Sequence, residues 1–358
     1  MLIVRSPVRI SFAGGGTDLP SFYEQFGGSV LSAAINKYFY TILGKRSDGR
    51  IQVISSDLRI FETWRDIATM DERGSGLEIP LAVMKDLGRD MSVDLFLASE
   101  IPPGTGLGSS ASVCVNILKT LATYLQIPLS KYDLAERAFR IAREGLQRHV
   151  GKQDEYAAAY GGLNRIVFHR DGGTEVAPVT LNADFAHAFE NSLMLFFTGS
   201  AHHSWTILEE QEKSTRTTGS SAAKALKRTE SFVPEMHDAL MKSDLPTFGS
   251  LLDQAWQAKK QVSSKISTSR IDHIYRVARD HGAMGGKITG AGGGGFLLLC
   301  CDPTNQSDVR RAMAAEGVRE MTFAFDAHGT QVIANDPFID SDDATGSRWT
   351  FVPVSSSL

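Results

Sequence analysis

The chain has 358 residues, of which 42% are hydrophobic, and it carries a formal net charge of −4. This length suits two domains, and the hydrophobic content is enough for sizeable cores. The weakly acidic balance offers no electrostatic footprint for nucleic acid, and no apolar run is long enough to span a membrane. Three cysteines cannot form a disulfide framework, and the segment before Pro7 is too short for a signal peptide. We therefore expect a cytoplasmic protein with reduced thiols that binds neither nucleic acid nor membranes.

Residue patterns along the chain predict an α+β organisation, with β-branched and aromatic runs for strands and apolar residues at helical spacing for helices. We expect strands, in chain order, at residues 29–35, 38–43, 51–55, 163–168, 192–198, 284–289, 296–301, 318–325 and 330–334. We expect helices at residues 80–86, 110–126, 130–146 and 306–316, and three or four more between residues 205 and 281. Ser130 is expected to cap its helix together with Asp133, and Pro234 and Pro246 are expected to punctuate the later helices.

A glycine-rich turn at residues 102–112 lies between a strand-like run at 93–97 and an apolar helical stretch at 113–118. Such a turn brings backbone N–H groups close to a phosphate, and the helix N-terminus adds unpaired donors and the positive end of its dipole. The residues that we expect to hold phosphates are Pro103, Gly104, Thr105, Gly106, Leu107, Gly108, Ser109 and Ser110. The spacing matches neither a Walker A loop nor a dinucleotide fingerprint. The alternative interpretation is an ordinary Gly/Ser turn with a serine N-cap.

Two further glycine clusters, at residues 6–20 and 287–296, accompany this turn. In order, spacing and content the three clusters resemble the signature motifs of the GHMP kinases, the superfamily of galactokinase, homoserine kinase, mevalonate kinase and phosphomevalonate kinase. The resemblance spans residues 3 to about 300, and three motifs in the correct order are highly specific. Within the superfamily, residues 9–18 and 151–162 are most similar to the D-glycero-D-manno-heptose 7-phosphate kinases.

The resemblance implies a two-domain GHMP kinase fold of the α+β class, with the active site in the cleft between the domains. A domain similar to the second domain of ribosomal protein S5 would carry the first two motifs over residues 1–185. A ferredoxin-like domain over residues 186–340 would carry the third motif, followed by a flexible tail at 341–358. The cofactors implied are ATP and Mg²⁺, the partner is a small-molecule sugar phosphate, and the expected state is a monomer or a homodimer.

Asp154 occupies the place of the aspartate that faces the acceptor hydroxyl in the sugar kinases of this superfamily. The resemblance therefore implies that Asp154 is catalytic, accepting the proton of that hydroxyl or positioning it. A capping role for a helix starting at Glu155 is the alternative, and the two roles are compatible. Arg9 matches the basic residue of the first motif, which meets the γ-phosphate or the catalytic aspartate. The alternative for Arg9 is a structural ion pair.

The family's magnesium ligands correspond to Ser110 and Glu144 in this sequence. Ser110 would supply a hydroxyl oxygen at the phosphates, and oxygen ligands are those that Mg²⁺ prefers. Glu144 fits a family glutamate that lies about ten residues before the catalytic aspartate. Its alternative is a solvated residue on the surface of a helix, because helix charge runs usually face water.

Substrate contacts implied by the first and third motifs are Gly15, Gly16, Thr17, Asp18, Thr289, Gly292 and Gly293. Asp18 matches an aspartate that binds sugar hydroxyls in galactokinase-like members, and a turn-forming role is its alternative. Gly15 stands where those proteins often carry a glutamate, which argues for a differently shaped sugar pocket. For the third cluster the alternative is a β-hairpin that needs positive φ angles. His202 stands where an arginine is expected in the heptose-phosphate kinases, a departure that bears on recognition of a distal phosphate.

Together these features predict an ATP- and Mg²⁺-dependent kinase for the anomeric hydroxyl of a heptose 7-phosphate, with the 1,7-bisphosphate as its product. One alternative is a kinase of an unphosphorylated sugar such as fucose or galactose. Another is a sugar-and-ATP sensor without catalytic activity. The presence of Arg9, Ser110, Glu144 and Asp154 favours the enzyme.

Overall fold

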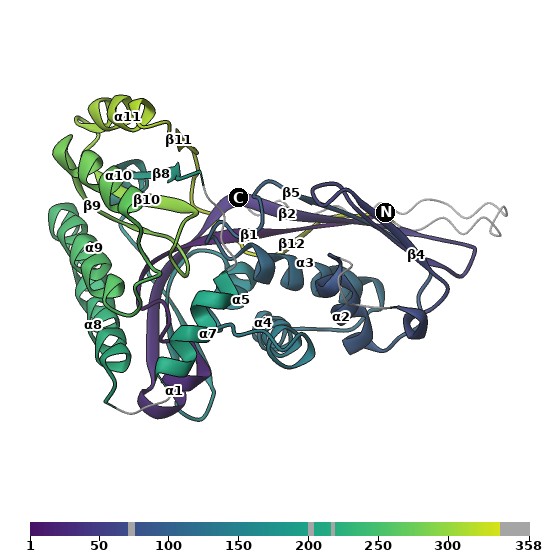
Figure 1. Ribbon diagram of the computed structural model, residues 1–358. Coiled ribbons are helices and arrows are strands. Elements are labelled where there is room, and N and C mark those ends of the chain that lie inside the picture. Colours follow the sequence, from purple (N-terminus) through teal and green to yellow (C-terminus); the bar gives the residue numbers. More distant parts are fainter. Residues whose placement is uncertain (71–75, 200–203, 216–218, 337–358) are drawn as a thin grey trace.

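The computed structural model describes residues 1–70, 76–199, 204–215 and 219–336 (Figure 1). Its first part contains β1 (Leu2–Ala13), α1 (Pro20–Phe26), β2 (Gly28–Lys45), β3 (Ile51–Ser55), β4 (Ile60–Trp64), a 3₁₀ turn (Ile67–Thr69), α2 (Glu78–Leu87), β5 (Val93–Ser99), α3 (Ser109–Tyr124), α4 (Lys131–Arg140), a π-helical turn (Ile141–Gly145), α5 (Gln153–Tyr160), β6 (Leu163–Phe168) and β7 (Thr174–Pro178). Its second part contains α6 (Ala183–Ser192), β8 (Leu193–Phe197), α7 (Ser204–Thr215), α8 (Ser221–Met241), α9 (Leu245–Lys260), α10 (Ser269–Asp280), β9 (Ala283–Ile288), β10 (Phe296–Cys301), α11 (Gln306–Ala315), β11 (Arg319–Glu320) and β12 (Gln331–Asn335). The predicted α+β organisation is therefore confirmed.

The first sheet has the strand order β12-β1-β2-β5-β3-β4, and β6 and β7 extend it beside β2. Strand β2 replaces the two strands expected at residues 29–35 and 38–43. It stays continuous because β1 pairs with it on both sides of an irregularity at Pro7 and Val8. At that irregularity Asn36 bonds instead to the backbone of Ala324. The patterns of the sequence marked the irregularity and not a strand end.

Helices α2 to α5 cover one face of this sheet (Figure 1). Helix α3 packs on β1 and β2 through a fully buried stripe that includes Ile117, Leu118 and Leu121. Helix α4 begins with the expected capping box, in which Ser130 and Asp133 each bond to the backbone of the other. The helix expected over 130–146 ends as the π-helical turn, so the chain after it leads directly toward α5.

The second sheet is antiparallel, with the order β11-β8-β10-β9. Strand β10 is buried on both faces: Leu298 and Cys300 join the core under α8 and α9, while Leu297 and Leu299 join the core under α10 and α11. Four helices occupy the region that the sequence assigned to three or four. Helix α8 runs through Pro234, because its buried stripe on both sides of the proline holds it against the core despite the lost backbone hydrogen bond.

The chain returns to the first sheet at its end, where β12 pairs antiparallel with β1. The C-terminal domain predicted over residues 186–340 therefore includes a strand that belongs to the N-terminal sheet. The strand expected at 318–325 is reduced to β11, and the following residues cross to the other sheet, where Phe325 forms a bridge with Ile35. The tail predicted at 341–358 lies outside the described residues.

Two expectations about composition can be compared with the fold. The three cysteines are free and buried, and burial raises the pKa of the Cys114 thiol. Among the described residues, no helix is both long enough and apolar enough to cross a membrane.

Candidate active site

The three glycine clusters meet where the two sheets approach each other. A Cβ atom on Gly106, whose φ is +81°, would lie 2.5 Å from the carbonyl oxygen of Thr289. A Cβ on Gly295 would clash with the carbonyl oxygen of Thr105, and the N–H of Phe296 donates to that same oxygen at 3.3 Å. The glycines of the third cluster therefore allow its backbone to pack directly on the backbone of the turn at 102–112, the phosphate loop below.

This contact can be tested with a matched pair of glycines. Gly106 and Gly49 both have positive φ (+81° and +73°), but a Cβ on Gly49 would meet nothing within 4 Å. Alanine at either position carries the cost of about 1–2 kcal/mol for a left-handed backbone. We expect Gly106→Ala to lower the free energy of unfolding by about 1–3 kcal/mol more than Gly49→Ala, because its Cβ overpacks the loop contact. Denaturant unfolding of both variants measures the difference, and equal losses would contradict the tight contact.

A pocket of about 730 Å³ lies beside these loops. The phosphate-loop residues that line it are Pro103, Gly104, Gly106, Gly108, Ser109 and Ser110. Helix α3 begins at Ser109, and its N-cap residue, Gly108, provides no side-chain cap. The first N–H groups of α3 are thus available to an anion, and this fits a bound phosphate. Thr105 and Leu107 are fully buried and shape the loop from behind, since Thr105 donates to Pro102 and Leu107 accepts from Arg9.

Arg9 and Asp154 form a two-pronged ion pair at the edge of the phosphate loop. The Nε and Nη2 atoms of Arg9 donate to the two carboxylate oxygens of Asp154 at 2.7 and 2.8 Å. The Nη1 atom donates to the carbonyl oxygen of Gly106 at 2.7 Å. Arg9 thereby joins β1, the phosphate loop and α5, and fixes the carboxylate of Asp154 with two charge-assisted hydrogen bonds.

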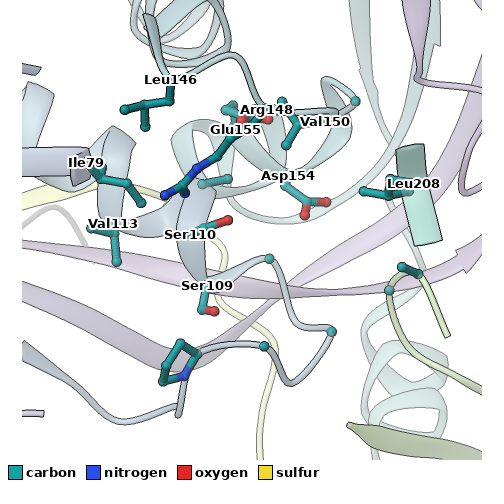
Figure 2. Close-up of a pocket in the computed structure, with 18 of the residues that line it drawn as sticks. Ile79, Ser109, Ser110, Val113, Leu146, Arg148, Val150, Asp154, Glu155 and Leu208 are labelled. Atoms are coloured by element: carbon teal, nitrogen blue, oxygen red, sulfur yellow. The ribbon is translucent and has the colours of Figure 1, made fainter. Parts of the chain in front are cut away.

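Asp154 lies in the first turn of α5, whose N-cap is Lys152. The capping role considered for Asp154 is therefore wrong: the N-cap lies two residues earlier, and no side chain caps this helix. The Asp154 side chain remains 27% exposed and lines the pocket together with Ser110. Figure 2 shows both side chains at the same space, with Leu208 of α7 pointing toward Asp154 from the other side.

Three first-cluster residues predicted to contact substrate, Gly15, Gly16 and Asp18, line the pocket. The carboxylate of Asp18 accepts hydrogen bonds from the N–H groups of Gly16 at 2.8 Å and Gln153 at 3.3 Å. Burial, followed by the negative charge of Asp154, raises the pKa of Asp18. The fourth residue, Thr17, is fully buried and points away, because its hydroxyl bonds to the carbonyl oxygens of Gly14 and Ser29.

Other predicted site residues are not brought to the pocket. Thr289 is fully buried and bonds to Phe296 at 3.2 Å, because its backbone forms the wall against the phosphate loop. Gly292 and Gly293 pack against Ile266. The third cluster lines the pocket instead through Gly290 and Ala291. Glu144 is exposed on the π-helical turn and is not among the lining residues. His202 lies outside the described residues.

Several lining residues were not singled out from the sequence. Gln153 and Glu155 flank Asp154, so their position next to the catalytic candidate was a usable signal. Burial, followed by the charge of Asp154, raises the pKa of Glu155 well above the ordinary value. Lys259, at the end of α9, carries no local signal and reaches the pocket only through the packing of the second domain.

Helix α7 forms the wall of the pocket opposite Asp154, to which it contributes Leu208 and Gln211. It is held to the first domain by the buried carboxylate of Glu212. That carboxylate accepts two hydrogen bonds from Arg143, at 2.7 and 2.9 Å, and lies 2.7 Å from the Nδ1 atom of His149. The wall therefore depends on contacts between residues that are distant in sequence.

Magnesium fits this pocket through few protein ligands. Among the described residues there is no cluster of three His, Cys, Asp or Glu side chains that could hold a metal. Mg²⁺ is ordinarily bound by one or two protein oxygens together with substrate phosphates and water, so such a cluster is not required. The exposed hydroxyl of Ser110 at the phosphate loop and the carboxylate of Asp154 are oxygens of the suitable kind.

We expect Ser110→Ala to raise the magnesium concentration needed for half-maximal activity, because a ligand oxygen beside the phosphates is lost. Glu144→Gln should leave that concentration unchanged, since Glu144 is exposed outside the pocket. Titration of magnesium at fixed ATP measures both. An unchanged requirement in Ser110→Ala would limit this residue to the start of the helix. An equal shift in Ser109→Ala would assign the effect to the helix N-terminus as a whole.

A glycine-lined anion site at a helix N-terminus, with an Arg–Asp pair beside it and a second domain closing the pocket, defines a two-domain phosphotransferase. Family models agree with this class. The model for the GHMP kinases N terminal domain matches residues 78–162, and the model for GHMP kinases C terminal matches residues 236–319.

Individual proteins are similar over nearly the whole chain. The D-glycero-alpha-D-manno-heptose 7-phosphate kinase of Campylobacter jejuni is 31% identical over 332 residues, which cover 91% of this chain and 97% of that protein. The solved structure of a D-glycero-D-manno-heptose 1-phosphate kinase from Bacteroides thetaiotaomicron matches with a TM-score of 0.79 and 26% identity, covering 94% of this chain and all of that one. The galactokinase of Lactococcus lactis, at 19% identity and a TM-score of 0.73 over 92% of this chain and 94% of that one, shares the fold.

The chain therefore belongs to the GHMP kinase family, whose members are ATP-dependent kinases. The predicted mixed α/β GHMP kinase fold, with N- and C-terminal domains, is confirmed.

Proposed function

We propose that this protein is a magnesium-dependent kinase that transfers the γ-phosphoryl group of ATP to the anomeric hydroxyl of D-glycero-D-manno-heptose 7-phosphate. The observation that carries the proposal is the position of Asp154. Its carboxylate lies 3.1 Å from the point that a Cβ on Gly108 would occupy, so it lies directly against the phosphate loop while facing the pocket. An acceptor hydroxyl bound at Asp154 would therefore be next to the transferred phosphoryl group.

The chain's own residues divide the work of transfer. The phosphate loop and the N-terminus of α3 bind the nucleotide phosphates, and Ser110 supplies an oxygen for Mg²⁺, which offsets their charge. Asp154, held by Arg9, orients the acceptor hydroxyl and takes its proton as the bond to phosphorus forms. Arg9 keeps a fixed positive charge at the boundary between acceptor and phosphates. Asp18 supplies a carboxylate for hydroxyl groups of the sugar.

The similar proteins support a heptose phosphate as the acceptor and leave a choice of position. One is named a 7-phosphate kinase and another a 1-phosphate kinase, at comparable identities of 31% and 26%. The similarity of residues 9–18 and 151–162 to the 7-phosphate kinases supports the 7-phosphate.

The test is a coupled ADP-release assay with heptose 7-phosphate, heptose 1-phosphate, free heptose, fucose and galactose, followed by phosphorus NMR of the product. We expect the 7-phosphate to be the best acceptor and the new phosphate to lie on the anomeric carbon. A product phosphorylated at carbon 7 from the 1-phosphate would contradict the proposed position. Absence of ADP release with every sugar would contradict the kinase function.

A second candidate, a kinase of an unphosphorylated sugar, is favoured by the charges of the pocket. Three carboxyl groups, of Asp18, Asp154 and Glu155, line it near Arg9 and Lys259. Such a balance suits neutral hydroxyl groups better than a dianionic phosphate. In the assay above, this candidate predicts that fucose or galactose outperforms every sugar phosphate.

A further inference from the structure

Three polar side chains converge on the space beside Gly15. A Cβ on Gly15 would lie 3.5 Å from the Oγ of Ser11, 3.7 Å from the Nε2 of Gln153 and 3.7 Å from the Nζ of Lys259. The three residues come from β1, α5 and α9, so both domains contribute. All four residues line the pocket, and each of the three side chains belongs to a residue that is at most 6% exposed.

These side chains have unused hydrogen-bonding capacity. Among the described residues, neither the Ser11 Oγ nor the Gln153 Oε1 has a hydrogen-bond partner. The ammonium of Lys259 donates to the carbonyl oxygen of Gly290 at 2.5 Å and forms no ion pair within the described part of the chain. An ammonium has three donors, so two remain. Buried polar groups are almost always hydrogen-bonded, and a cluster that is not points to a ligand.

The surroundings indicate what kind of ligand would fit. Lys259 faces Arg9 of β1, Asp18 of the loop after β1 and Asp154 of α5, with Lys287 of β9 behind it. Positive and negative groups therefore share this corner, and donors stand next to acceptors. Hydroxyl groups of a sugar both donate and accept, whereas a phosphate would be repelled by the two carboxylates.

We propose that Ser11, Gln153 and Lys259 form a subsite for hydroxyl groups of the acceptor sugar adjacent to the hydroxyl that reacts, with Lys259 as its charged anchor. This inference rests on the proposed function in one respect, namely that the acceptor is a sugar. The absence of a side chain at Gly15 leaves the space open. A phosphate carried by the acceptor then lies outside this corner of the pocket.

The charge of Lys259 gives the subsite a pH dependence. Burial, followed by the charge of Arg9, lowers the pKa of Lys259 from its ordinary value of 10.5 to about 8, against the opposing influence of Asp18 and Asp154. The ammonium is therefore present below pH 8 and is lost as the pH rises through that value. Binding of the sugar should weaken over the same interval, whereas binding of ATP should not.

The test compares Lys259→Met with Lys260→Met at pH 7. Lys260 is the next residue of α9, with its Nζ 3.1 Å from Asp272 and no place in the pocket lining. We expect Lys259→Met to lower kcat/KM for the acceptor about 10- to 100-fold, the range for loss of buried hydrogen bonds to a charged group, while KM for ATP stays within about twofold. Lys260→Met should resemble the wild type. Lys259→Arg should remove the decline near pH 8, because an arginine stays charged.

Each outcome separates the two proposals. Equal losses in the acceptor and ATP constants, or in Lys259→Met and Lys260→Met, would overturn the subsite while leaving the kinase function standing. If heptose 7-phosphate is not phosphorylated, the proposed function fails, and the variants are compared on the best acceptor of the sugar panel. If calorimetry with a non-hydrolysable ATP analogue and Mg²⁺ detects no binding of any sugar in that panel, the subsite is overturned as well and holds water only. Thermal unfolding of each variant shows that it is folded.

Discussion

Asp154→Asn is expected to lower turnover at least about 100-fold while the affinity for ATP stays close to that of the wild type. The carboxylate lies between the phosphate loop and the pocket and is held by two hydrogen bonds from Arg9. Asparagine retains the shape but can neither take a proton nor balance the charge of Arg9. Acid–base assistance of this kind typically contributes about 10²–10⁴ in rate, so its loss affects the chemical step. Steady-state kinetics and nucleotide binding measure the two quantities separately.

The substitution also leaves the nearly buried guanidinium of Arg9 without its charge partner, so stability must be measured alongside activity. Asp280→Asn, at the end of α10 and outside the pocket lining, is the matched control and should keep the wild-type rate. A folded Asp154→Asn protein with more than a tenth of the wild-type turnover would contradict catalysis by Asp154 and leave only its ion pair with Arg9.

The sequence was informative where a function depends on consecutive residues. The phosphate loop, its helix and the capping box of α4 could each be predicted because turn chemistry and helix termini are local properties. The place of Arg9 could be predicted as well, although its partner could not be decided between a phosphate and Asp154. The structure shows the bond to Asp154 and a second one to Gly106.

Long-range packing explains the remaining differences. The expectation that Thr289, Gly292 and Gly293 touch substrate came from the density of glycines, and nothing local distinguishes a glycine that admits a ligand from one that admits another backbone. Here the backbone of the phosphate loop takes that space. Lys259 and the return of β12 to the first sheet depend on how the second domain docks, and therefore left no pattern in the sequence.

The heptose 7-phosphate should exceed the free heptose in kcat/KM by roughly 100-fold, which corresponds to about 2.7 kcal/mol. A dianionic phosphate accepts several charge-assisted hydrogen bonds, and binding energy from a remote group also positions the reacting hydroxyl. Arg148 and His149 line the same pocket, away from the balanced corner of Asp18 and Lys259, and supply groups for such contacts.

The comparison is made with both acceptors at saturating ATP and Mg²⁺, with free phosphate added to the free heptose as a control for anion effects. A gain that appears mainly in kcat would show that the distal phosphate positions the sugar at Asp154, whereas a gain in KM alone would show simple binding. Equal efficiency for the two acceptors would assign the protein to the kinases of unphosphorylated sugars. The histidine at position 202, in place of the arginine expected in the heptose-phosphate kinases, would then be the residue in the sequence that marks the difference.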